Sequence, residues 1–232
     1  MHLLITGGAK PLGRHLAAGL RPPHRVRLTD WQPDGGDAEL VACDLGHDEA
    51  TDRLVEDVDV VLHTVFRPRR QDCPTAWIDA NTRRTYNLLL AASQAGVRQA
   101  ILLSTLDLFL AYDPGMTVSE AWRPRPTCQP ESLGPHLAEC VAREFAHTHA
   151  LKVLIVRLGH VVTQEEAHSL PFDPLWVDVR DVVGLVQAAL GQELPQFGVV
   201  HLQHDSPRAR FRHHAHRHSL PYAPQFAFED RA

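Results

Sequence analysis

Short apolar runs alternate along the chain with longer stretches in which apolar residues recur with helical spacing. The short runs predict strands at 3–6, 25–30, 40–44, 58–62, 100–104, 153–156 and 199–202. The longer stretches predict helices at 11–20, 48–56, 75–95, 132–148 and 181–190. Most of the predicted strands are apolar on both faces, which is typical of a parallel sheet covered by helices on both sides. The alternation therefore predicts an α/β fold with a doubly wound parallel sheet.

This alternation extends over residues 1–203, which we interpret as one domain with a short loop insertion at 160–178. Residues 204–232 are rich in proline, histidine and arginine and have no clear period, so they predict an irregular tail or a small cap. Within them, 208–218 is a dense run of arginine and histidine. We expect a solvated surface or an oligomer contact there rather than a metal site, because no carboxylate lies within the run.

The composition narrows the function classes. The 232 residues are 44% hydrophobic and carry a formal net charge of −5, which argues against a nucleic-acid binder. No apolar run approaches the ~18–20 residues that a membrane span needs. The four cysteines, at positions 43, 73, 128 and 140, have neither zinc-site spacing nor the pattern of a disulfide scaffold. With a first strand that begins almost at Met1, these features predict a cytoplasmic protein without a signal peptide.

A glycine-rich turn connects the first predicted strand to the first predicted helix. It reads Thr6-Gly7-Gly8-Ala9-Lys10-Pro11-Leu12-Gly13, and such a turn directs backbone N–H groups and a helix N-terminus at a pyrophosphate. Asp30 ends the second predicted strand, 17 residues after Gly13. A carboxylate at that place accepts hydrogen bonds from the adenine-ribose hydroxyls and repels a 2′-phosphate. The sequence therefore predicts a Rossmann-type site that binds NAD in preference to NADP.

The same turn resembles that of the extended short-chain dehydrogenase/reductases, the NAD-dependent epimerase/dehydratase family. In that pattern a glycine stands where this chain has Lys10, whose ammonium either pairs with a phosphate, crowds the cofactor or faces solvent. The resemblance continues over roughly residues 1–203 and is greatest to the uronate dehydrogenases. It implies cofactor roles for residues that follow the later strands or lie on the helix after the fourth: Asp44, Leu45, His63 and Asn81. In the same helix Arg84 stands where the family pattern has a glycine.

The resemblance also implies a catalytic Tyr-x-x-x-Lys pair, which this chain lacks. Its only tyrosines are at 86, 112 and 222, and its only lysines are at 10 and 152, so no alignment register restores the pair. Thr105 matches the family's catalytic hydroxyl residue, or alternatively caps the end of its strand. Glu131 and His136 are the candidate substitutes, because both side chains titrate near neutrality in a suitable environment. Alternatively Glu131 is a helix-start carboxylate and His136 a surface residue.

Two functions remain open at this point, besides a scaffold whose nucleotide site is blocked by Lys10. The first is an atypical oxidoreductase or epimerase that uses NAD on a sugar or sugar acid, with a non-standard acid/base. The second is an inactive dinucleotide-binding sensor, regulator or assembly partner. The resemblance further implies a homodimer formed through the helices at about 75–95 and 132–149. Arg67, Arg69 and Arg70 follow the fourth predicted strand and either pair with a substrate anion or lie in a solvated loop.

Overall fold

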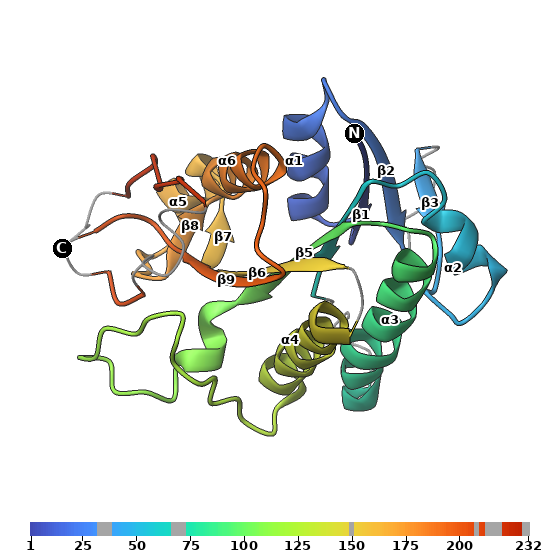
Figure 1. Cartoon of the computed structure of the whole chain (residues 1–232). Coiled ribbons are helices and arrows are strands. Elements are labelled where there is room, and N and C mark those ends of the chain that lie inside the picture. The colour runs from blue at the N-terminus through green and yellow to red at the C-terminus, as the bar shows by residue number, and fades with distance from the viewer. Residues whose placement is uncertain (32–38, 66–72, 149–150, 207–208, 212–219, 229–232) are drawn as a thin grey trace.

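The structure is a computed structural model that describes residues 1–31, 39–65, 73–148, 151–206, 209–211 and 220–228. Its centre is a seven-stranded sheet in the order β3-β2-β1-β4-β5-β6-β9, in which every neighbouring pair is parallel (Figure 1). The strands are β1 (His2–Thr6), β2 (Arg25–Asp30), β3 (Leu40–Ala42), β4 (Val60–Thr64), β5 (Gln99–Thr105), β6 (Lys152–Leu158) and β9 (Phe197–Leu202). The predicted Rossmann-type fold class is confirmed.

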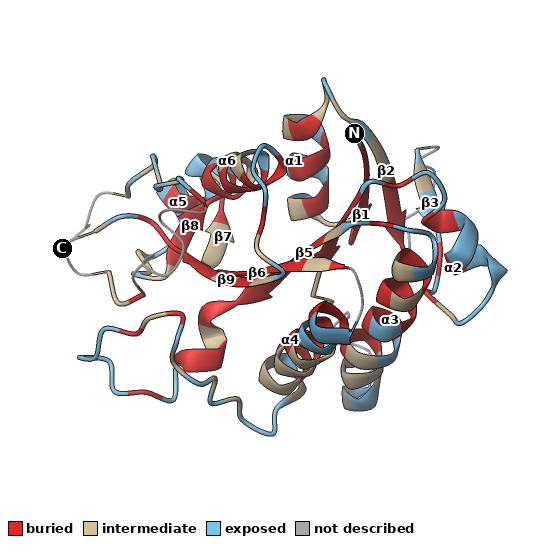
Figure 2. Ribbon diagram, in the orientation of Figure 1, coloured by how far each residue is buried: buried red, intermediate tan, exposed pale blue. Residues whose placement is uncertain are grey.

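Helices cover both faces of the sheet. One face carries α1 (Pro11–Leu20) and α6 (Val179–Leu190), and the other carries α2 (Glu49–Leu54), α3 (Pro74–Gln94) and α4 (Pro130–Thr148). In Figure 2 the buried residues follow the strands and the sheet-facing sides of these helices. The sheet is thus the middle of three layers, as its strands predict.

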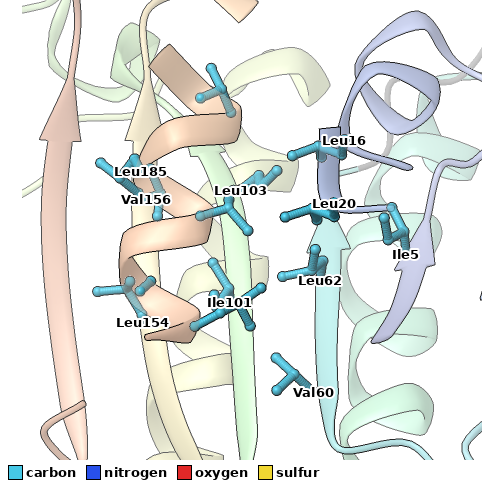
Figure 3. Close-up of a cluster of buried hydrophobic side chains, with 14 of the residues drawn as sticks. Ile5, Leu16, Leu20, Val60, Leu62, Ile101, Leu103, Leu154, Val156 and Leu185 are labelled. Atoms are coloured by element: carbon cyan, nitrogen blue, oxygen red, sulfur yellow. The ribbon is translucent and has the colours of Figure 1, made fainter. Parts of the chain in front are cut away.

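Alternate residues of the central strands point into two separate cores. On β5, Ile101 and Leu103 pack toward α1 and α6, whereas Leu102 packs toward α3 and α4. Figure 3 shows the first of these cores, where Leu16 and Leu20 of α1 face the sheet. Because the central strands β1, β4, β5 and β6 are buried on both faces, their sequences are largely continuous apolar runs instead of alternating ones.

Two short segments differ from the prediction. The loop expected at 160–178 contains a small parallel sheet of β7 (His160–Val162) and β8 (Trp176–Asp178), with α5 (Gln164–Ser169) between them. A single 3₁₀ turn, η1 (Leu106–Phe109), follows β5. Strands of three residues are too short to show a period, which explains why the sequence pattern missed them. Strand β4 both begins and ends two residues later than expected. His63 therefore lies inside the strand instead of after it.

The C-terminal segment 220–228 is irregular but firmly attached to α6. The buried carboxylate of Asp181 accepts hydrogen bonds from the Tyr222 hydroxyl at 2.8 Å and from the backbone N–H groups of Gln225 and Phe226 at 2.7 and 3.2 Å. Of the basic run 208–218, only 209–211 lie among the described residues. Within the part of the chain that the structure describes, no helix is both long and apolar enough to cross a membrane.

Candidate functional site

A groove of about 390 Å³ runs along the carboxyl ends of the parallel strands. Strand order reverses between β1 and β4, and doubly wound sheets bind their ligands at such a switch point. One end of the groove is formed by the end of β2, its middle by the turn after β1 and the end of β4, and its other end by β5, β6, β7 and the start of α5. The volume lies within the range of small-molecule sites.

The turn between β1 and α1 has the conformation that its glycines permit. Gly7 has φ +67°, a left-handed value that favours glycine, and a Cβ there would lie 2.3 Å from the Thr64 hydroxyl oxygen. A Cβ on Gly13 would lie 2.4 Å from the Gly7 carbonyl oxygen. The two glycines therefore let the start of α1 approach the end of β1 closely. This places the N-terminus of α1 against the groove, where it favours an anion.

Lys10 fits this turn without backbone strain. It is the N-cap residue of α1, with φ −86° and ψ 155°, values that any residue adopts. Its half-buried side chain lines the groove together with Leu12 and Gly13. The fold therefore forms the turn with a lysine at this position, and a cation stands beside the N-terminus of the helix.

Asp30 lies at the β2 end of the groove, as predicted. Its carboxylate is only 2% exposed and accepts a hydrogen bond from the Ala9 N–H at 3.2 Å, so the acid is tied to the glycine turn. The next residue, Trp31, also lines the groove. Sequence reasoning missed Trp31, although its position directly after the acidic strand end was the available signal.

Five predicted cofactor residues do not line the groove. Gly8 packs under Leu28 and Leu40, and the Leu45 side chain is buried in the core beneath α3. Asp44 is exposed and forms an ion pair with Arg84, and the buried Asn81 donates to the Trp77 carbonyl at 2.9 Å.

His63, the fifth of these residues, is enclosed between two threonines. One ring nitrogen lies 2.8 Å from the Thr6 hydroxyl and the other lies 2.9 Å from the Thr85 hydroxyl. Burial lowers the pKa of His63 to about 3, so the imidazole is neutral and joins β1 to α3. The next residue, Thr64, is the one that lines the groove.

At the β5 end of the groove the lining hydroxyl residue is Ser104. Its Oγ is buried and has no hydrogen-bond partner among the described residues. The predicted Thr105 instead accepts a hydrogen bond from the Asp107 N–H at 3.1 Å and caps η1, which is the alternative that the sequence left open. A buried hydroxyl without a hydrogen-bond partner destabilises the folded protein unless a ligand or a water molecule supplies that partner. Ser104 is therefore a better candidate than Thr105 for a ligand contact.

The two predicted acid/base residues occupy different environments on α4. Glu131 is exposed in the first turn of the helix, where a carboxylate is favoured. His136 is half-buried, its Nε2 lies 3.9 Å from the Cys140 sulfur, and its Nδ1 finds no partner in the described part of the chain. Burial lowers the pKa of His136, which favours its neutral form. His136 is not the surface residue that the alternative expected. Neither Glu131 nor His136 is among the described residues that line the groove.

None of the tyrosines or lysines outside the turn replaces the missing pair. The Tyr112 hydroxyl donates to the Arg123 carbonyl at 2.9 Å, and Tyr222 is bound to Asp181. Tyr86 lies on α3 with its ring against Phe145. Lys152 pairs with Glu193 at the start of β6, at the opposite edge of the sheet from the groove.

Sequence reasoning also missed a three-residue cluster beyond the carboxyl end of β6. His160, the first residue of β7, contacts Asp173 with Nδ1 at 2.5 Å and Asp107 with Nε2 at 2.9 Å. The two carboxylates raise the pKa of His160 to about 9, with the hydrogen bond to Asp107 as the larger cause. The charged imidazole joins η1, β7 and the loop before β8. The predicted Arg67, Arg69 and Arg70 lie outside the described residues.

Sequence comparison agrees with this geometry. The profile of the NAD dependent epimerase/dehydratase family matches residues 3–172, most of the chain and both ends of the groove. The chain belongs to this family. The match includes the glycine turn and Asp30 and extends beyond β6, so the resemblance noted in the sequence is confirmed.

Individual relatives are similar along most of their length. A uronate dehydrogenase of Pseudomonas syringae pv. tomato is 29% identical over 197 residues, covering 81% of this chain and 69% of the relative. An L-arabinose 1-dehydrogenase (NAD(P)(+)) of Haloferax volcanii is 24% identical over 183 residues, covering 72% and 70%. Among solved structures, a mutant uronate dehydrogenase of Agrobacterium tumefaciens complexed with NAD has a TM-score of 0.84 at 23% identity, covering 97% of this chain and 84% of that one. The last comparison supports the fold.

Proposed function

We propose that this chain is an NAD-dependent oxidoreductase that acts on a sugar or sugar-acid derivative through a non-standard acid/base group. The groove carries the proposal, because a helix N-terminus with a glycine turn and the buried Asp30 meet at the switch point of the sheet. The curated relatives are named as a uronate and an arabinose dehydrogenase, which favours a sugar as the substrate.

The described residues fit a dinucleotide along the groove. Asp30 would hold the adenine ribose and disfavour the 2′-phosphate of NADP, while Gly7, Leu12 and Gly13 would let the pyrophosphate approach the backbone. Lys10 would add a cation for the same phosphates. Ser104, with its free hydroxyl, would face the nicotinamide end. When bound, NAD supplies the hydride acceptor, and the remaining task of the chain is to orient the substrate and take its proton.

For that proton we propose His136. Its neutral imidazole has an unpaired ring nitrogen among the described residues, whereas Glu131 is exposed and Thr105 is engaged in capping η1. Removing a general acid/base costs roughly 10²–10⁴-fold in rate. His136→Gln is therefore expected to lower kcat by that factor, with little change in the Kd of NAD.

The deciding experiment is a calorimetric titration with NAD followed by turnover assays on a panel of aldoses and uronic acids. We expect NAD binding together with NADH formation for at least one sugar, and lower activity in His136→Gln. Glu131→Gln is the matched control, because it changes a residue on the same helix. If neither NAD nor NADH binds at millimolar concentration, the proposal is wrong.

The second candidate is a dinucleotide-binding sensor or regulator without turnover. The absence of Tyr-x-x-x-Lys from the sequence favours this second function, because no other tyrosine and lysine of the sequence form such a pair for proton transfer. NAD binding without turnover on any sugar of the panel would support this function.

We further propose a cytoplasmic homodimer formed through α3 and α4. Tyr86 is 50% exposed on α3, and Leu133, Leu137 and Val141 of α4 are only partly buried. Such a surface suits a second copy. Analytical ultracentrifugation is expected to show a dimer that Leu137→Glu weakens. The four free cysteines are consistent with a reducing compartment.

A further inference from the structure

A buried arginine lies behind the β2 end of the groove. Arg84 of α3 is 6% exposed, and its guanidinium carbon lies 3.8 Å from the centroid of the Trp31 ring. Its Nη2 lies 2.5 Å from an Asp44 carboxylate oxygen, and its Nε lies 3.9 Å from Asp79. The side chain therefore joins α3 to the segments that follow β2 and β3.

Burying this cation is costly, and the structure shows what offsets the cost. Desolvation lowers the pKa of Arg84, while the nearby carboxylates of Asp44, Asp79 and Asp30 act in the opposite direction. Nε and Nη1 nevertheless find no hydrogen-bond partner among the described residues. A guanidinium that is nine-tenths buried and leaves two nitrogens unpaired is poorly explained as a surface ion pair.

Trp31 connects Arg84 to the groove. Trp31 lines the groove, and its ring stacks on Arg84, so the arginine holds the ring of a groove residue in place. A flat indole beside Asp30 suits a planar base whose ribose hydroxyls reach that carboxylate. Arginine is well suited to hold the ring, because its guanidinium is planar and weakly hydrated.

We infer that Arg84 is a positioning residue for adenine recognition: it holds Trp31 as a platform on which the purine of an adenine nucleotide stacks. The inference rests on the proposed NAD site and adds which part of the ligand this residue governs. Arg84 acts on the adenosine half of the cofactor and leaves the nicotinamide half unaffected.

The chain contains a matched control on the same helix. Arg83 carries the same charge and contacts the same acids, with Nε 2.7 Å from Asp79 and Nη2 3.9 Å from Asp44. Its side chain is far more exposed than that of Arg84, and its ion pairs are with these acids. Arg83→Met thus removes the same charge from the same helix and leaves the Arg84–Trp31 stack in place.

The test is to titrate wild type, Arg84→Met and Arg83→Met with NAD, AMP and NMN by calorimetry. We expect Arg84→Met to weaken the binding of NAD and AMP by about tenfold, as the loss of a stacked cation predicts. The affinity for NMN should change by less than twofold. Arg83→Met should leave all three affinities within twofold of wild type. In a Trp31→Ala background, Arg84→Met should add little, because the arginine acts through the indole.

Three outcomes would overturn the inference: equal effects of the Arg84 and Arg83 variants, equal losses for AMP and NMN, or additive losses with Trp31→Ala. If Arg84→Met does not fold, Arg84→Lys is used in its place, because lysine keeps the charge near Asp44 and removes the planar stack. The melting temperature of Arg84→Lys is measured together with its affinities. We again expect a loss of affinity for AMP and little change in the affinity for NMN. Wild type that fails to bind NAD refutes the proposed function itself, whereas wild type that binds NAD with unchanged affinity in Arg84→Met refutes only this inference.

Discussion

Replacing His160 with glutamine is expected to remove a pH-dependent part of the stability of this protein. The imidazole lies between Asp107 and Asp173 and joins three segments beyond the carboxyl end of β6. Its pKa rises from 6.5 to about 9 on folding. At about 1.4 kcal/mol per unit this corresponds to roughly 3 kcal/mol, and since the side chain is 37% exposed, solvent screening reduces the expected value to about 1.5 kcal/mol.

The direction of the pH dependence follows from the raised pKa. The folded protein binds the proton of His160 more tightly than the unfolded chain, so the stabilisation is complete below about pH 6.5. It decreases as the pH rises and is lost as the pH passes about 9. The difference in unfolding free energy between wild type and His160→Gln should therefore be largest at pH 6 and smallest at pH 9.5.

Urea unfolding at pH 6, 7.5 and 9.5 measures this difference, with unfolding followed by tryptophan fluorescence. Replacing the exposed His47 with glutamine is the control for losing one histidine, and it should change the unfolding free energy equally little at all three pH values. A His160→Gln difference that does not vary with pH, or that grows toward pH 9.5, would refute the reasoning.

Three further predictions concern other parts of the molecule. Asp181→Ala should destabilise the protein by about 2 kcal/mol and expose 220–228 to chymotrypsin, because the carboxylate accepts three hydrogen bonds that attach or cap this segment. Cys73 should react with iodoacetamide at pH 7.5 faster than the exposed Cys128, since a hydrogen bond from a threonine hydroxyl lowers the pKa of Cys73; peptide mass spectrometry gives both rates. Lys10→Met should weaken the binding of NAD by about tenfold and reduce the salt dependence of the Kd for NAD. An unchanged Kd would indicate that the Lys10 side chain lies in solvent and does not contact the ligand.

The features that the sequence predicted well are local ones. Residues buried on both faces of β5 and β6 must be apolar, so the run itself reveals the strand. Gly7 and Gly13 are required by the conformation of a single turn, and Asp30 follows from the spacing to the next strand end. Each of these signals depends on neighbours within a few tens of residues, which is why a pattern in the chain is sufficient.

The features that the sequence missed depend on contacts between distant segments. Arg84 meets Trp31 across 53 positions of the chain, and His160 meets Asp107 across the same separation. The choice between Ser104 and Thr105 was missed for another reason. It depends on a 3₁₀ turn of four residues, whose capping bond engages the Thr105 hydroxyl and leaves that of Ser104 for the groove. Such a turn is too short to produce a periodic pattern of hydrophobic residues in the sequence.

Two departures from the family pattern lie at the β1 and β2 side of the groove. Lys10 and Arg84 stand where that pattern has glycine; Lys10 lines the groove, and Arg84 stacks on Trp31, which also lines it. The family's catalytic lysine is absent from this sequence, so no lysine on α4 lowers the pKa of a tyrosine. Under the proposed function, Lys10 would therefore favour nucleotide binding through its charge, and Arg84 through the indole of Trp31. Lys10→Met and Arg84→Met should therefore bind NAD more weakly than wild type does. We expect any turnover to depend on an uncharged base such as His136.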